Sequence, residues 1–192
     1  MYICLLPMND NCQERKANQM NANFAAVVYT PKQTDKSALP NFVKGLKARG
    51  VSVAGILQES SVQSGDSMRT IESVDIATGH RIPIKKPMKN EEDCGLDVTS
   101  LTETSAVLRN VLATEPNAVP DLVVVEKFGD QEQIGEGLLD EIMQIIAEGI
   151  PLLISVPEPA LEIWQELSGD LGAVIDFEAG ALQDWWKEIE AV

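Results

Sequence analysis

The sequence predicts an α/β domain with three layers, in which helices cover both faces of a mostly parallel five-stranded sheet. Short runs of β-branched and apolar residues alternate with stretches of helical periodicity along the 192 residues, which is the pattern of a parallel α/β fold. The run at 122–125, LVVV, is apolar throughout, as in a strand with both faces buried. A chain of this length can bury roughly 70% of its unfolded surface, enough for one good core.

The elements can be placed from their periodicity and from the residues that flank them. Gly50 and Gly149 stand where helix C-caps belong. Ser100 and Glu103 have the spacing of a capping box. Strands are expected at 23–29, 51–57, 122–125, 151–156 and 173–177, and helices at about 37–49, 100–112, 138–146, 159–167 and 182–189.

Two parts of the chain fall outside this alternation. The runs 70–76 and 81–84 flank a turn and predict an antiparallel hairpin, inserted at about 68–90. Residues 1–21 are polar after a short apolar patch and show no periodicity, which predicts a flexible N-terminal tail. Residues 22–192 are therefore expected to form a single domain.

The composition limits the partners and compartments that suit the chain. Its net charge is −15, so we expect it to be soluble and to repel nucleic acid and anionic membranes. Most acidic residues lie in the second half, where solvated helix faces are the expected explanation. Three cysteines without paired spacing fit a reducing cytosol. No apolar run reaches the roughly 20 residues of a membrane span. A cytoplasmic location is therefore expected.

The loop after the first strand is the usual place for a phosphate cradle. A P-loop has the pattern G-x-x-x-x-G-K-[ST], in which the glycines let backbone amides surround the phosphates. Here the frame begins at Thr30 and ends with Lys36 and Ser37, but both glycines are absent. Asp35 replaces the second glycine and sets a carboxylate where a phosphate would lie. An ordinary strand–helix loop and an altered phosphate site are both compatible with this pattern.

A second group of candidate residues stands at the exits of two other strands. Glu126 and Lys127 come directly after the buried run LVVV, and Phe128 and Gly129 follow them. Because open α/β sheets bind ligands at the carboxyl ends of their strands, Glu126 could hold a metal ion or a water molecule, and Lys127 could offset its charge. The alternative is an exposed ion pair, worth about 0–1 kcal/mol. Glu59, at the end of the second strand, is expected at the same edge.

Several other kinds of site are unsupported. His80 is the only histidine, so no site with two or three histidine ligands can form within one chain, and no metal site is predicted. No Gly-x-Ser-x-Gly elbow occurs, and no Gly-x-Gly-x-x-Gly follows a strand. The sequence therefore gives no support to serine-hydrolase chemistry or to a Rossmann dinucleotide site.

Several stretches together resemble a family of uncharacterised bacterial proteins that are often labelled molybdenum-transport ATP-binding-like. The most specific stretch is KFG-x-QE, from Lys127 to Glu132. The others are 25–31, GILQE at 55–59, DIATG at 75–79, Cys94 with 96–97, and GIPLLISVP at 149–157. The family in turn is similar to small nucleoside triphosphatases of the thermophile type. The resemblance covers about 23–186 and implies a P-loop-NTPase-like fold, although those triphosphatases keep the full phosphate cradle that this chain lacks.

The leading hypothesis combines the sheet edge with this resemblance. It is a P-loop-like protein that binds a nucleotide or a small anion in an accessory or regulatory role, with a link to molybdate handling. A nucleotide with Mg²⁺ is the cofactor considered, and proteins of molybdate transport or cofactor synthesis are the partners considered. Expected ligand contacts are Thr30, Lys36, Ser37, Glu59, Phe128 and Gly129, and expected catalytic residues are Glu126 and Lys127.

Two alternatives remain open. One is slow hydrolysis of nucleoside triphosphates, with Lys36 on a phosphate and Glu126 positioning water or Mg²⁺; the missing glycines argue against it. The other is a non-catalytic interaction module that uses the acidic second half and the helix with Trp185 and Trp186. Adjacent helical residues lie about 100° apart, so one of the two tryptophans could face a partner.

Overall fold

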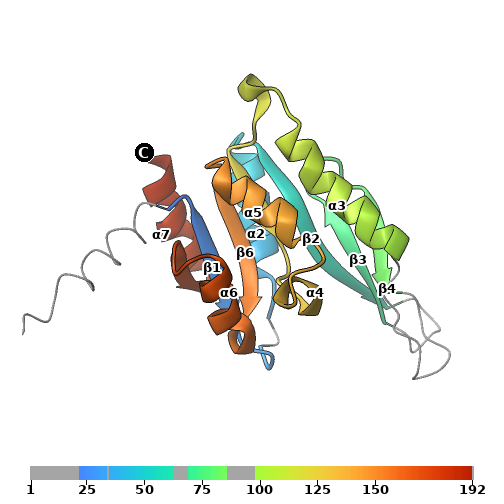
Figure 1. Ribbon diagram of the computed structural model, residues 1–192. Coiled ribbons are helices and arrows are strands. Elements are labelled where there is room, and N and C mark those ends of the chain that lie inside the picture. The colour runs from blue at the N-terminus through green and yellow to red at the C-terminus, as the bar shows by residue number, and fades with distance from the viewer. Residues whose placement is uncertain (1–21, 34, 63–68, 86–97, 192) are drawn as a thin grey trace, which may run out of the picture.

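The fold is built on a seven-stranded sheet. Figure 1 shows this sheet between two layers of helices. The computed structural model describes residues 22–33, 35–62, 69–85 and 98–191. The predicted tail, both outer ends of the predicted hairpin insertion and Cys94 lie outside the described residues. The strands are β1 (Phe24–Tyr29), β2 (Val53–Val62), β3 (Arg69–Asp75), β4 (Arg81–Lys85), β5 (Leu122–Val125), β6 (Leu152–Pro157) and β7 (Ala173–Asp176).

The order of strands across the sheet is β4-β3-β2-β5-β6-β1-β7. Five strands are parallel, as predicted: β1 pairs with β6 and β7, and β5 pairs with β2 and β6. The predicted hairpin, β3 and β4, joins the same sheet through antiparallel pairing with β2. β2 can serve both neighbours because it is long. Its pairing with β5 ends at Ile56, and its pairing with β3 continues to Val62.

The helices cover both faces of the sheet. Helices α2 and α7 pack on one face, and α3, α5 and α6 pack on the other (Figure 1). Ser100 lies within α3, so the predicted capping box at Ser100 and Glu103 is wrong: the helix begins earlier, at Val98. The bounds are α2 (Ala38–Ala48), α3 (Val98–Leu112), α4 (Asp130–Gln133), α5 (Leu139–Ala147), α6 (Leu161–Leu167) and α7 (Ala179–Glu190), with 3₁₀ turns η1 (Pro116–Ala118) and η2 (Glu158–Ala160).

The core follows the pattern that predicted it. All four residues of β5 are fully buried, as expected for a central strand with helices on both faces. On α2 the apolar residues at helical spacing are the ones that face the sheet. On α7 both Trp185 and Trp186 are buried, at 5% and 4% exposed. Neither tryptophan therefore faces outward, and the interaction module considered above loses its main feature.

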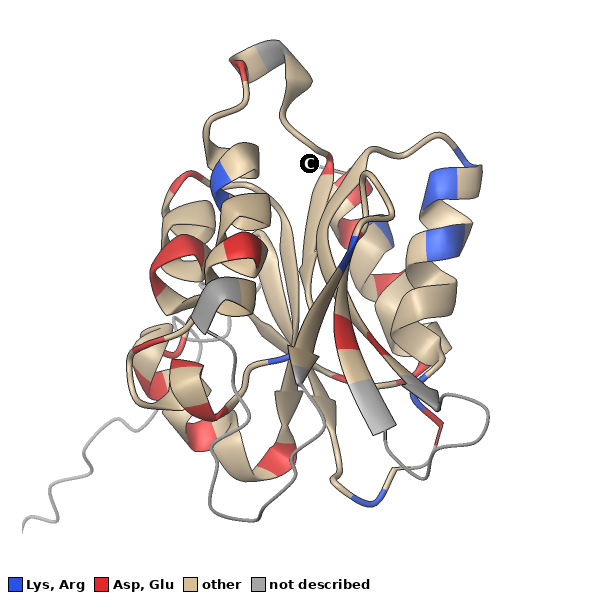
Figure 2. Ribbon diagram, turned by 90° about the vertical axis from the view of Figure 1, so that its right-hand side faces the viewer, with Lys and Arg blue, Asp and Glu red and all other residues tan. Residues whose placement is uncertain are grey.

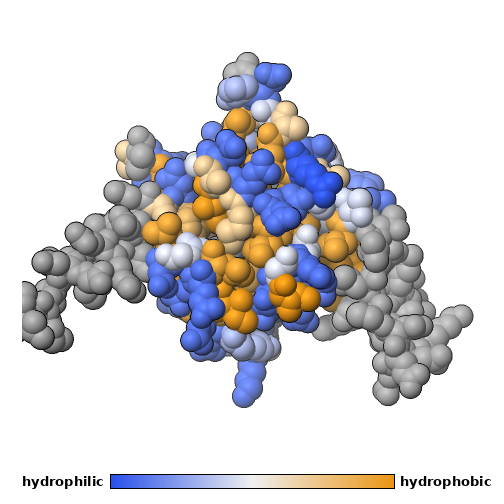
Figure 3. All heavy atoms as spheres, viewed as in Figure 1, coloured by the Kyte–Doolittle hydropathy of each residue, from blue (hydrophilic) through white to orange (hydrophobic). Residues whose placement is uncertain are grey.

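Charge and apolar side chains are both dispersed over the surface. Figure 2 shows Asp and Glu on helices of both layers, as expected for solvated helix faces. In Figure 3, hydrophobic residues alternate with hydrophilic ones on the face that carries α3, α5 and α6. Within the described ranges, no helix is both long and apolar enough to cross a membrane. The larger exposed apolar residues are Val119, Ile134, Leu167, Leu171 and Val174.

Gly55 occupies a position on β2 where a side chain would run into the backbone of β5. Its φ is +106°, and a Cβ at this position would lie 2.1 Å from the carbonyl oxygen of Val124. The carbonyl of Gly55 also accepts a 2.9 Å hydrogen bond from the backbone N–H of Ile76. A side chain is therefore excluded here by backbone conformation and by space. The close approach fixes the position of β2 at the edge where the strands end.

Replacing Gly55 by alanine should destabilise the fold by about 2–4 kcal/mol, because the new Cβ meets strand backbone and the residue must keep a positive φ. Urea unfolding measures the change. Gly45→Ala is the matched control: nothing lies within 4 Å of a Cβ at this position in α2, so it should stabilise by about 0.5–1 kcal/mol. Equal effects at the two glycines would contradict the close approach of β2 and β5.

Candidate functional site

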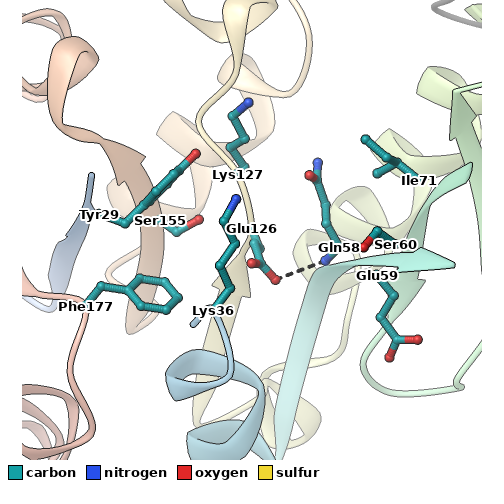
Figure 4. A pocket seen from close by; sticks show the side chains of 10 residues that line it. All are labelled: Tyr29, Lys36, Gln58, Glu59, Ser60, Ile71, Glu126, Lys127, Ser155 and Phe177. Carbon is teal, nitrogen blue, oxygen red and sulfur yellow. Dashed lines mark hydrogen bonds between the residues drawn. The ribbon is translucent and has the colours of Figure 1, made fainter. Parts of the chain in front are cut away.

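A pocket of about 190 Å³ opens at the carboxyl edge of the sheet (Figure 4). Pockets that enclose drug-sized ligands are usually about 300–1,000 Å³. This one therefore suits a small ion, or a single group of a larger ligand. Its lining residues are Tyr29, Lys36, Gln58, Glu59, Ser60, Ile71, Glu126, Lys127, Ser155 and Phe177.

One wall of the pocket is the part of β2 that extends past β5. Glu59 lies inside this strand and not at its end as predicted, because pairing with β3 keeps the strand extended as far as Val62. The Glu59 carboxylate accepts a 2.6 Å hydrogen bond from Arg81 on β4. Arg81 also bonds Glu72 on β3 at 3.0 Å. Glu59 and Glu72 therefore share the single positive charge of Arg81.

Glu126 lies at the centre of the pocket, at the end of β5. Its side chain is buried, at 8% exposed, and Oε2 accepts a 3.1 Å hydrogen bond from the backbone N–H of Gln58. Among the described residues, Oε1 has no hydrogen-bond partner, and no ion pair joins Glu126 to Lys127. Burial raises the pKa of Glu126; the Gln58 hydrogen bond and Lys36 oppose that rise, and Glu59 adds to it.

Lys36 reaches the pocket from the loop before α2. Its Nζ lies 5.2 Å from the centroid of the Tyr29 ring, which is a cation–π geometry. Burial, with smaller contributions from Glu126 and Asp130, raises the pKa of Tyr29 to about 12. The Tyr29 hydroxyl therefore keeps its proton at neutral pH and can donate a hydrogen bond to an anion.

Ser155 supplies an unpaired hydroxyl to the same pocket. The residue is 1% exposed, and its Oγ has no hydrogen-bond partner in the described part of the chain. A buried polar group without a partner costs about 1–3 kcal/mol, so such a group calls for a ligand or a water molecule. Figure 4 shows Ser155, Tyr29 and Lys36 reaching toward the same space from three elements.

Two hydrogen bonds join described residues of the loop between β1 and α2. The Thr30 carbonyl accepts a 3.0 Å bond from the backbone N–H of Gln33. Asp35 Oδ1 accepts a 2.8 Å bond from the backbone N–H of Ser37, and this interaction lowers the pKa of Asp35. The amide that would face a phosphate in a P-loop thus faces a carboxylate of the chain itself. Neither Thr30 nor Ser37 lines the pocket.

The residues that follow Lys127 are held by packing and hydrogen bonds next to the pocket. Phe128 is fully buried and packs edge-to-face on Trp164, with ring centroids 5.5 Å apart. Its backbone N–H donates a 2.8 Å bond to the carbonyl of Ser155. The buried carboxylate of Glu132 accepts the backbone N–H groups of Gly129, at 2.8 Å, and Leu138, at 3.0 Å. Phe128 and Gly129 therefore hold the chain in place without lining the pocket.

The structure thus divides the predicted site residues into two sets. Lys36, Glu59, Glu126 and Lys127 line one pocket, and Thr30, Ser37, Phe128 and Gly129 lie outside it. Within the described residues, no group of three or more His, Cys, Asp or Glu side chains could hold a metal ion. Sequence reasoning missed Tyr29 and Ser155. For Ser155 a signal existed, since it is the one polar residue in the buried run LLISV of β6.

Comparisons with known proteins agree with this architecture. Residues 24–185 match the model of a family described as Protein of unknown function (DUF2478). The Molybdenum import ATP-binding protein ModC 2 of Bradyrhizobium diazoefficiens is 31% identical over 165 residues. The match takes in 85% of this chain but 18% of that protein, so the chain spans about a fifth of the length of this curated relative.

Two solved structures share the fold. A human cancer-related nucleoside triphosphatase, determined in solution, has a TM-score of 0.66 at 19% identity and covers 87% of this chain and 97% of its own. THEP1 from the hyperthermophile Aquifex aeolicus, a crystal structure, has a TM-score of 0.64 at 13% identity, with 87% and 99% covered. The predicted P-loop-NTPase-like α/β fold is confirmed.

Replacing Glu132 by alanine should destabilise the protein by about 2–4 kcal/mol, because the backbone N–H groups of Gly129 and Leu138 would lose their acceptor. Chemical denaturation measures the change. Glu136→Ala is the control, an exposed glutamate of the same segment, and it should stay within about 0.5 kcal/mol of the parent. A Glu132 variant as stable as this control would show that the carboxylate does not hold the segment.

Replacing Glu126 by glutamine should stabilise the protein at neutral pH. The folded-state pKa of Glu126 is raised, so ionisation costs stability as the pH climbs from the ordinary value of 4.5 through the folded-state pKa. Glutamine cannot ionise and avoids this cost, and the advantage should vanish below about pH 4. Unfolding at a series of pH values measures it, with Glu188→Gln on the exposed face of α7 as the control. An advantage that is absent, or that grows on acidification, would reverse the assigned sign.

Proposed function

The chain belongs to the DUF2478 family, and we propose that it binds a small oxyanion, free or as the terminal phosphate of a nucleotide, in the pocket at the carboxyl edge of its sheet. The observation that supports this most directly is the buried, unpaired hydroxyl of Ser155, which lines the same pocket as two lysines. A tetrahedral anion offers several acceptors at once, and this pocket offers several donors.

The charge of the pocket suits an anion. Lys36 and Lys127 each contribute a positive charge, and the charge of Glu59 is partly offset by Arg81, which it shares with Glu72. Hydrogen bonds to charged groups contribute about 1.5–3 kcal/mol each, so two ammonium groups and two hydroxyls form a credible site for an oxyanion. Glu126 forms no ion pair within the described residues and is the buried negative group that a ligand would meet in the pocket.

Binding of an anion fits the geometry better than hydrolysis of a nucleoside triphosphate does. The pocket is too small to enclose a nucleotide, so a nucleotide would have to leave its base and sugar outside. The loop at 30–37 also closes on itself through Asp35 and Ser37. Hydrolysis with Lys36 on a phosphate and Glu126 positioning water would need that loop to open.

Molybdate is the first oxyanion to test. A relative over most of this chain is named for molybdenum import, although the matched stretch is a minor part of that protein. We propose an accessory or regulatory role in oxyanion handling, exercised in the cytoplasm, in which this domain reports or holds the anion for a transport or cofactor protein. A partner of that kind is part of the proposal.

Replacing Ser155 by alanine should have opposite effects on stability and on binding. Loss of an unpaired buried hydroxyl should stabilise the free protein by about 1 kcal/mol. Loss of a donor to the anion should raise the dissociation constant about tenfold. Thermal unfolding and calorimetric titration with molybdate, phosphate, sulfate, ATP and GTP measure the two effects and tell a free anion from a nucleotide.

Ser73→Ala is the matched control for this experiment. Ser73 on β3 is also buried with an unpaired hydroxyl, but it does not line the pocket. It should therefore share the stabilisation and leave binding unchanged. Lys36→Ala should weaken binding about tenfold or more, and Lys32→Ala in the same loop should leave it within about twofold. If no anion or nucleotide binds at millimolar concentration, the proposed function is wrong.

A further inference from the structure

We propose that the pocket takes up one proton together with its oxyanion, and that this proton lies between Oε1 of Glu126 and a ligand oxygen. The inference rests on the proposed anion-binding function and deepens it. It divides the possible ligands into oxyanions that carry a proton of their own, such as monohydrogen phosphate or a phosphate monoester, and oxyanions that carry none, such as sulfate and molybdate.

The hydrogen bonds of Glu126 leave one oxygen for the ligand. Oε2 is taken by the backbone N–H of Gln58, and the dashed line in Figure 4 shows this bond. Oε1 has no partner among the described residues and lies in a pocket whose donors are Lys36, Tyr29 and Ser155. An anion held by those donors brings one of its oxygens toward Oε1. Two anionic oxygens repel at such a distance unless a proton joins them.

The groups around Glu126 determine how much charge the pocket can accept. Two other carboxylates lie near Glu126. Glu59 is paired with Arg81, and Asp130 contributes to the raised pKa of Tyr29. Lys36 and Lys127 provide positive charge for the anion, and a proton between Glu126 and the anion removes the repulsion between their facing oxygens. The groups that face it are Lys36 before α2, Tyr29 on β1, Glu59 on β2, Lys127 on its own segment and the uncharged Ser155 on β6.

The burial of Glu126 also favours its protonation when an anion binds. Desolvation already raises the pKa of Glu126 in the free protein, so protonating it costs less than protonating an exposed carboxyl. The pKa of Tyr29 is about 12, so its hydroxyl acts as a fixed donor and does not exchange its proton in the neutral range. Glu126 is therefore the group of this pocket that changes its protonation when an anion enters.

The two classes of oxyanion should differ in how their binding depends on pH. Monohydrogen phosphate supplies the shared proton itself and donates it to the ionised Oε1. With sulfate or molybdate, one proton leaves the solvent and bonds to Oε1, and no other bond changes. Because one proton is coupled to binding, affinity for sulfate and molybdate should fall about tenfold per pH unit where free Glu126 is ionised. Affinity for phosphate should fall much less over that range.

The experiment is calorimetric titration of the full chain with molybdate, sulfate and phosphate at about pH 8 and about pH 9, in buffers of different ionisation enthalpy. The expected uptake approaches one proton for each molybdate or sulfate and is near zero for phosphate. In Glu126→Gln, the amide N–H is a permanent donor, so molybdate and sulfate should bind without uptake and without the loss of affinity at high pH. Glu188→Gln is the control and should keep the uptake, because Glu188 is exposed on α7 and does not line the pocket.

The outcomes separate this inference from the function on which it rests. Binding of molybdate or sulfate without proton uptake, or an uptake that persists in Glu126→Gln, overturns the inference and leaves the anion-binding function standing. Failure of all three anions to bind either protein at millimolar concentration overturns the function and the inference with it. If Glu126→Gln does not fold, the buffer comparison on the unsubstituted protein decides alone.

Discussion

The pairing of β2 with two different neighbours is the constraint on which the site depends. Up to Ile56 the strand pairs with β5 in the parallel part of the sheet, and beyond that point its strand partner is β3. Just before that point stands Gly55, whose positive φ would direct a Cβ into the backbone of β5. The extended part then stands above the carboxyl edge as a wall, and the backbone N–H of Gln58 on that wall fixes the carboxylate of Glu126. Without the added hairpin this edge would be open.

Some polar groups at the pocket are paired within the chain and stabilise the fold, while others have no partner and are available to a ligand. Glu132 and Glu59 have their partners within the chain, and these interactions hold the segments around the pocket. The buried hydroxyl of Ser155 lacks a partner among the described residues, and it lines the pocket together with Glu126. Folded proteins pair nearly all their buried polar groups. Polar groups left unpaired at the edge of an α/β sheet therefore indicate where a ligand contributes the missing interactions.

Local patterns in the sequence were sufficient for most of the fold. The apolar run of β5, the helical spacing on α2 and the turn of the hairpin each depend on neighbours in sequence, and the structure has all three. The site was predictable in part, because Lys36, Glu126 and Lys127 follow strands whose ends must meet at one edge. Errors arose where distant segments decide. Glu59 lies inside a strand because β3 pairs with it, and Ser155 is unpaired because no facing segment offers a partner.

The carboxylate of Asp35 accepts the backbone N–H of Ser37, just before α2. In a P-loop, backbone N–H groups at this place bind phosphate. A carboxylate tethered two residues away is present at high effective concentration, so a phosphate in solution competes poorly for that amide. Because Asp35 already bonds this N–H group, no external anion has to approach the loop backbone, and glycine is not needed there. The donors of the candidate pocket lie instead on side chains at the ends of strands and in the loop before α2. The proposed anion site is therefore built from side chains, where a P-loop uses backbone amides.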